Sequence, residues 1–195
     1  MDIDIDTKTG FDPSTVFPDI VQASMLVDDG YKKHNVGWYF QNMPSDPVTN
    51  LAAIPYDEAE QYGFFKIDFL SINVYDNFNS KSEIRELLKL EPNWDLLLDK
   101  ENYLNLFQIH RYFDVVSRIR PRSIPELADC IALIRPGPRS LLDSYVNSNP
   151  EDRIKIRPLI YDGNWEGFSF KKSHAHAYAL TIVLQLHLID MDKII

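Results

Sequence analysis

The stretch Asp2-Ile3-Asp4-Ile5-Asp6 alternates strictly between a carboxylate and an isoleucine. Successive side chains of a β-strand point to opposite faces, so a strand here places three carboxylates on one face and two isoleucines on the other. An acidic terminus that frays in solvent would show the same alternation. The stretch therefore predicts a strand, and its acidic face has two interpretations: a metal site or a solvated acidic segment.

A second segment with period two lies downstream, at residues 63–70. Its aromatic and isoleucine side chains share one predicted face, whereas Lys66 and Asp68 share the other. Residues 36–40 are predicted to form a shorter strand, because a glycine precedes them and a proline follows them. Residues 7–30 are predicted to be rich in turns and then helical.

From residue 80 onward, the spacing of apolar residues becomes that of helices. Ser82 is the N-cap candidate of a first helix, and Ser173 is that of a last helix ending near Ile189. Further helices are predicted at residues 100–118, 123–134 and 137–147. The apolar stripe of the last helix consists of Ala177, Leu180, Leu184 and Leu188.

These patterns predict an α/β fold with a boundary near residue 79. A small mixed sheet is expected in residues 1–78, and a mostly helical region is expected in residues 79–195. The first region holds 13 acidic and 4 basic residues, and the second holds 16 of each. An acidic region beside a more basic one suits a metal site facing a phosphate-binding surface, although ordinary proteins show the same asymmetry.

Composition excludes several other classes of protein. The 195 residues carry a net charge of −9, which argues against a generic nucleic-acid coat, since nonspecific affinity comes from lysine and arginine. Cys130 is the single cysteine, so no internal disulfide forms, and the N-terminus lacks the pattern of a secretion signal. Polar residues interrupt the apolar segment 177–189, which is also too short to span a bilayer. We therefore expect a cytoplasmic protein without a membrane partner.

Alternating aspartates on one strand, joined by another aspartate from a neighbouring strand, match the needs of two-metal nucleotidyl transfer. That chemistry uses two ions roughly 3.5–4 Å apart between shared carboxylates. Mg²⁺ prefers such hard oxygen ligands, and Mn²⁺ is the alternative.

Three further segments carry a family resemblance. They are GFFKIDFLSI at residues 63–72, ADCIALIRPGP at residues 128–138 and FKKSHAHAYAL at residues 170–180. Together with the acidic strand, and in the same order, they resemble motifs of the bacterial DNA polymerase III alpha subunit, a family C replicative polymerase. The resemblance implies a reduced palm-like region in residues 1–78 and a fingers-like region in residues 79–195.

The resemblance also implies the residues of the acidic site. Asp4, Asp6 and Asp68 match the family's metal ligands and are the expected catalytic residues. Lys66 matches a lysine whose charge approaches the incoming triphosphate. The expected partners are accordingly DNA and a deoxynucleotide, with Mg²⁺ as the cofactor.

Nucleotide or phosphate binding is further implied for the later motifs, whose matching residues are Arg135, Lys171, Lys172, Ser173 and His174. Each motif also has a purely structural interpretation. The Pro-Gly-Pro after Arg135 enforces a chain stop, and the Lys-Lys-Ser-His segment can simply cap the last helix, with His174 stacked one turn before Tyr178. His174 and His176 diverge on a helix, so a histidine metal site is not expected.

The chain also departs from the family. Only 61 residues separate Asp6 from Asp68, fewer than in the family, and the family's phosphate-binding GRGSxxxS loop is absent. Residues 138–170 lack the family's YQEQ and RRAMGKK-like segments. We therefore expect a reduced or split polymerase, plausibly encoded by a phage, that needs a second polymerase or replisome protein for activity. The alternatives are a non-catalytic protein that binds DNA, nucleotide or a replisome component, and a phage structural or accessory protein.

Overall fold

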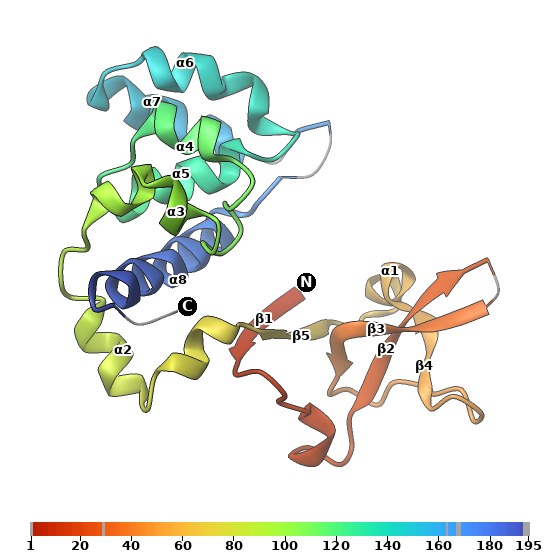
Figure 1. The fold of residues 1–195 in the computed structure, drawn as a ribbon. Helices are drawn as coiled ribbons and strands as arrows, with labels where there is room; N and C mark the ends of the chain where they lie inside the picture. Colours follow the sequence, from red (N-terminus) through yellow and green to blue (C-terminus); the bar gives the residue numbers. More distant parts are fainter. Residues whose placement is uncertain (1, 29, 163, 167–168, 193–195) are drawn as a thin grey trace. The chain divides into compact units, whose positions relative to one another are not determined.

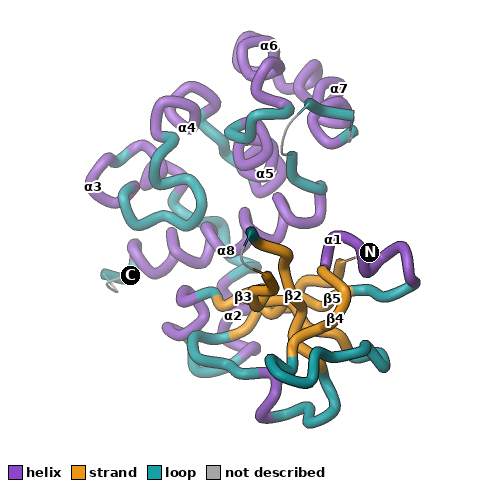
Figure 2. The backbone as a smooth tube through the Cα atoms, turned by 90° about the vertical axis from the view of Figure 1, so that its right-hand side faces the viewer, coloured by secondary structure: helices purple, strands orange, loops and turns teal. Residues whose placement is uncertain are grey.

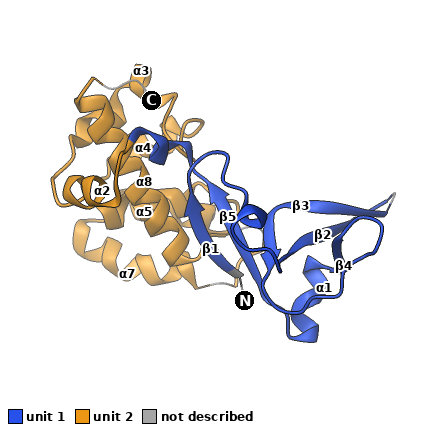
Figure 3. Ribbon diagram, turned by 90° about the horizontal axis from the view of Figure 1, so that it is seen from below, with its two compact units in different colours: residues 1–77 blue, residues 78–195 orange. Residues whose placement is uncertain are grey.

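The computed structural model describes residues 2–28, 30–162, 164–166 and 169–192. The chain divides into two compact units, Met1–Asn77 and Phe78–Ile195 (Figure 3). The first unit contains the sheet and the second is helical (Figures 1 and 2). The predicted α/β class is confirmed.

Unit 1 is built on a five-stranded sheet with the order β1-β5-β3-β2-β4. Its strands are β1 (Asp2–Thr7), β2 (Val21–Val27), β3 (Gly30–Tyr39), β4 (Leu51–Pro55) and β5 (Lys66–Ser71). The pairs β1/β5 and β2/β4 are parallel, whereas β2/β3 and β3/β5 are antiparallel. The sheet is therefore mixed, as predicted. A short helix, α1 (Tyr56–Ala59), follows β4.

The acidic stretch forms the edge strand β1, and its only sheet neighbour is β5. Ile3 and Ile5 lie on the face opposite the aspartates and remain 41% and 40% exposed. The small core of unit 1 lies farther along the sheet and consists of Ala23, Tyr39, Met43, Ala52 and Ala59.

Two expectations for unit 1 are wrong. Residues 21–27 form strand β2 and not a helix, and β3 begins at Gly30, six residues before the predicted strand. The reason is tertiary: β2 and β3 pair as an antiparallel hairpin from Val27 and Gly30 outward, and β4 supports the other edge of β2. The first five residues of β2, VQASM, do alternate in polarity, and this local signal of a strand was missed.

Unit 2 has seven α-helices among the residues that the structure describes. They are α2 (Lys81–Leu87), α3 (Lys100–Tyr103), α4 (Phe113–Ile119), α5 (Ile124–Leu133), α6 (Leu142–Asn147), α7 (Pro150–Tyr161) and α8 (Lys172–Asp190). Helices α5 and α8 pack against each other at the centre (Figure 1). Residues 181–188 of α8 are all buried, so this helix has no solvent face there. Of the predicted stripe, Leu184 and Leu188 are buried, whereas Ala177 and Leu180 are only partly buried. Outside the stripe, Ala175, Ala179 and Ile182 are fully buried.

Helix starts in unit 2 differ from the sequence prediction in two places. The N-cap of α2 is Ser80, whose Oγ accepts a hydrogen bond from the backbone N–H of Glu83, and not Ser82. Helix α8 begins after Lys171 without any side-chain cap, so Ser173 is not its N-cap. The cap of α5 is Ser123, which bonds the N–H of Glu126 at 3.3 Å, so the helix predicted at 123–134 is confirmed.

The helix predicted at 100–118 is instead two short helices, α3 and α4, separated by turns. Gln108, between them, has φ +61°, a left-handed conformation that a continuous helix excludes. Helix α7 was not predicted, because Pro150 and Pro158 suggested a break. Pro150 occupies the first turn of α7, where proline is tolerated, and Asn149 Oδ1 caps the N–H of Asp152 at 2.9 Å.

No helix within the described part of the chain is both long and apolar enough to cross a membrane.

Candidate functional site

The pairing of β1 with β5 brings the predicted acidic residues to one face of unit 1. The parallel register places Asp4 opposite Asp68 and Asp6 opposite Leu70. Paired residues of neighbouring strands share a face, and side chains two positions apart on one strand also share it. Asp4, Asp6, Lys66 and Asp68 therefore lie on the same side of the sheet, and the predicted strand pairing is confirmed.

Lys66 and Asp68 form a partly buried ion pair on this face. The Lys66 ammonium donates to Asp68 Oδ2, and the two side chains are only 5% and 14% exposed. The other carboxylate oxygen, Asp68 Oδ1, is buried and accepts no hydrogen bond from any described residue. A buried oxygen of a carboxylate without a donor is costly, so this atom is a natural point for a cation to bind.

Gly37 of β3 makes room for this ion pair. It lies opposite Asp68 in the antiparallel β3/β5 register. A Cβ atom at this position would lie 2.5 Å from Lys66 Cδ and 3.0 Å from Asp68 Oδ1. It would also lie 2.7 Å from Nδ1 of His34, the atom that accepts the backbone N–H of Gly37 at 2.9 Å. Sequence reasoning missed Gly37, although a glycine inside a strand is a signal of close approach.

Two aromatic rings flank the lysine. The Tyr56 ring lies 5.0 Å from the His34 ring, centroid to centroid, and 5.8 Å from Lys66 Nζ. The latter distance is within the range of a cation–π contact. Lys66 is therefore held by Asp68 on one side and by an aromatic ring on another.

The other predicted ligands are less enclosed. Asp6 is exposed, and its Oδ2 accepts the hydroxyl of Tyr75 at 3.0 Å. Asp4 is partly buried. Among the described residues, no three His, Cys, Asp or Glu side chains are grouped closely enough to hold a metal ion. In this arrangement, the neighbours of Asp68 and Asp6 are therefore a lysine and a tyrosine.

The predicted phosphate-binding residues lie in unit 2. Arg135 is partly buried: its Nη2 donates to Gln108 Oε1 at 2.6 Å, and its guanidinium lies 4.4 Å from the Phe170 ring centroid. Burial lowers the pKa of Arg135. Lys171, Lys172 and Ser173 are exposed at the start of α8, and His174 is partly buried. Arg135 thus has an internal packing role, whereas the lysines face solvent.

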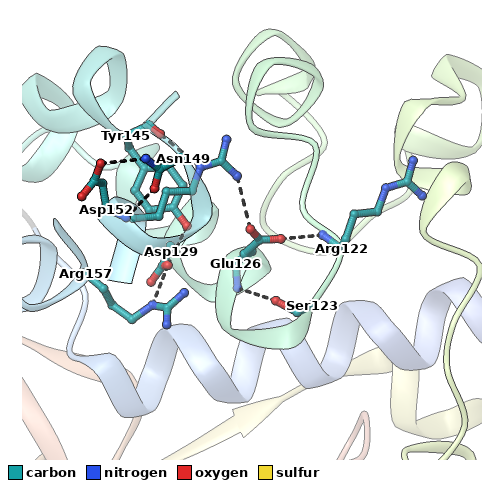
Figure 4. A network of polar contacts seen from close by, with 9 residues as sticks. Arg122, Ser123, Glu126, Asp129, Tyr145, Asn149, Asp152 and Arg157 are labelled. Atoms are coloured by element: carbon teal, nitrogen blue, oxygen red, sulfur yellow. Dashed lines mark hydrogen bonds and ion pairs between the residues drawn. The ribbon is translucent and has the colours of Figure 1, made fainter. Parts of the chain in front are cut away.

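Unit 2 also contains a polar network that sequence reasoning missed (Figure 4). Asp129 is fully buried on α5, and its carboxylate accepts hydrogen bonds from Tyr145, Arg157 and Tyr161 at 2.7, 2.7 and 3.2 Å. Burial raises the pKa of Asp129, and these bonds oppose the shift. A second pair, Arg153 with Glu126 at 3.2 Å, lies in the same network.

Comparison with known proteins gives one family. The family model described as bacterial DNA polymerase III alpha subunit finger domain matches residues 45–161, which is more than half of the chain. The matched range contains Lys66, Asp68 and Arg135, and it ends before α8. No curated protein matches the chain. The chain belongs to the finger-domain family of the bacterial DNA polymerase III alpha subunit.

Proposed function

We propose that this chain is a reduced polymerase III alpha-like protein that catalyses metal-dependent nucleotidyl transfer to a DNA primer end, together with a second chain. The observation that carries the proposal is the β1/β5 register, which sets Asp4 directly opposite Asp68. Lys66 lies on the same face. This combination offers carboxylates for divalent ions and a cation for the triphosphate.

Asp4, Asp6 and Asp68 are the residues that would hold Mg²⁺ or Mn²⁺, provided that their side chains move closer together than in the described arrangement. Bound there, the ions would supply charge neutralisation at the triphosphate and a more acidic primer hydroxyl. The buried Oδ1 of Asp68, which has no hydrogen-bond donor among the described residues, supports the fit. Lys66 would have to release Asp68 for both carboxylate oxygens to be available, and the triphosphate is the anion that would attract its ammonium.

The need for a partner follows from the basic residues that stand where the family has a basic segment. These four are Arg139, Arg153, Lys155 and Arg157, and each forms an ion pair within the chain. Their partners are Asp114, Glu126, Asp152 and Asp129, respectively. Arg139, Arg153 and Lys155, engaged in this way, contribute little to holding a triphosphate, and phosphoryl transfer depends on such positioning. Arg157 is bound to Asp129 through Nε.

We expect the isolated chain to bind Mn²⁺ weakly and to extend a primer little or not at all, because its basic residues in this segment are held in ion pairs. Activity should rise when the partner chain is added. Asp6→Ala or Asp68→Ala should then abolish extension, with losses on the order of 100-fold or more, and should leave the fold intact. Primer-extension assays with Mg²⁺ or Mn²⁺ measure the loss of activity, and thermal unfolding shows whether each variant remains folded.

Asp19→Ala is the matched control, since Asp19 is an exposed aspartate of the same unit away from the acidic face. It should leave extension unchanged. Rapid primer extension by the chain alone would show that no basic residues from a second chain are needed to position the triphosphate. Extension that survives Asp68→Ala would show that the aspartates are not the site.

A second candidate is a non-catalytic protein that binds DNA. The closed Lys66–Asp68 pair favours it, because that pair occupies the carboxylate that a metal would use. Binding would then rest on exposed cations such as Lys171. Lys171→Gln should lower affinity for single-stranded DNA and reduce the slope of log affinity against log salt by roughly one. Filter binding over a salt series tests this, and binding that is insensitive to salt would exclude it.

A further inference from the structure

A pocket of about 260 Å³ opens in unit 2 where α5, α7 and α8 meet. Its polar lining consists of Asp129, Arg157, Tyr161, Lys172 and His176. The family resemblance assigns Lys172 alone among these. The pocket lies entirely within unit 2 and shares no residue with the acidic face of unit 1.

The buried side chain of Asp129 lines one side of this pocket. Its carboxylate already accepts hydrogen bonds from Arg157 and Tyr145 (Figure 4). It also accepts one from the hydroxyl of Tyr161. The bond to Arg157 uses the Nε atom of the guanidinium. It therefore fixes the orientation of Arg157 and leaves the two terminal amino groups as donors.

Two more donors come from α8. Lys172 and His176 are four residues apart, so they lie on the same side of the helix one turn from each other. In the part of the chain that the structure describes, the side chains of Lys172 and His176 make no hydrogen bond or ion pair. Arg157 is itself ion-paired with Asp129, so the pocket differs from the surroundings of Arg139, Arg153 and Lys155 by the two donors that α8 adds.

We propose that this pocket binds a phosphate group carried by a nucleotide or by the backbone of a nucleic acid. With His176 neutral, its charged lining sums to +1: Arg157 and Lys172 against Asp129, in a chain whose net charge is −9. Arginine presents a planar fork that matches phosphate oxygens, and lysine and histidine add donors from a second direction. A tetrahedral anion uses donors that converge from two helices, whereas a planar carboxylate fits the arginine fork alone.

The experiment titrates the intact chain with inorganic phosphate, dATP and a single-stranded oligonucleotide, by calorimetry at low salt. His176→Gln and Lys172→Gln should each weaken binding of inorganic phosphate about tenfold, the effect of losing one hydrogen bond to a charged group. Lys81→Gln is the matched control, because this lysine of the same unit is exposed and does not line the pocket. It should change phosphate affinity less than about twofold.

Arg157→Lys tests the arginine fork while keeping a positive charge beside Asp129. It should weaken phosphate binding at least as much as His176→Gln, and thermal unfolding shows whether the variant remains folded. Tighter binding of dATP or of the oligonucleotide than of phosphate identifies the source of the phosphate. The proposal is overturned by absence of phosphate binding, by equal losses in Lys81→Gln, or by citrate binding as tightly as phosphate. Because phosphate binding is read without catalysis, it can fail or succeed independently of primer extension.

Discussion

Asp129→Ala is expected to lower the free energy of unfolding of the helical unit by about 3–5 kcal/mol, the range for breaking a buried ion pair on one side. The substitution leaves the guanidinium of Arg157 without its counter-charge and removes the acceptor of two tyrosine hydroxyls. Tyr145 is fully buried, so its hydroxyl would lose its partner away from water. Urea unfolding followed by far-ultraviolet circular dichroism measures the change.

Asp143→Ala is the control for this prediction. Asp143 pairs with Arg118 at 2.6 Å, but the two side chains are 80% and 45% exposed. An exposed pair of this kind contributes less than about 1 kcal/mol. Equal destabilisation by the two substitutions would mean that the Asp129 network contributes no more than a surface ion pair.

The acidic face of unit 1 was predictable because its signal is local. Strict alternation in β1 and β5 assigns each side chain to a face of its own strand, whereas the joining of the two strands in one site was expected from the family resemblance. Ser123 was predictable as a helix start for a similar reason, since its cap involves a residue three positions away.

Other features depend on residues far apart in the sequence. Asp129 lies within the apolar run of α5. The residues near it in the sequence do not predict its hydrogen bonds to Tyr145, 16 residues away, and Arg157, 28 residues away. The neighbours of strand β2, its hairpin partner β3 and the parallel strand β4, also come from other parts of the chain. The pocket likewise requires α5, α7 and α8 to meet, so its donors were visible only as scattered basic residues.

Gly37→Ala is expected to disable the acidic face, even though Gly37 bears no chemical group. The added methyl would meet Lys66 Cδ and the backbone-bonded Nδ1 of His34 well inside contact distance. The Lys66–Asp68 pair must then shift, and a displacement of about 1 Å at a reacting site can cost roughly 100-fold in rate. Both the affinity for Mn²⁺ and the rate of primer extension should fall. Overpacking should also lower the free energy of unfolding by about 1–3 kcal/mol.

Gly10→Ala separates crowding from backbone strain. Gly10 has φ +78° and nothing within 4 Å of an added Cβ, so its substitution strains the backbone without touching the site. It should cost about 1 kcal/mol of stability and leave Mn²⁺ affinity unchanged. If both variants lose Mn²⁺ affinity equally, the loss reflects unfolding of unit 1 and not displacement of the ion pair.

A double-mutant cycle identifies the contact itself. Lys66→Ala removes the Cδ atom that an added Cβ at position 37 would meet most closely, at 2.5 Å. In that background, Gly37→Ala should cost less stability than it does in the native chain, with an interaction free energy of about 0.5–3 kcal/mol. Additive effects would mean that the lysine is free to move aside. Gly37 would then have no part in fixing Lys66 against Asp68, and the expected loss of metal affinity would have to arise at His34 or at Asp68 directly.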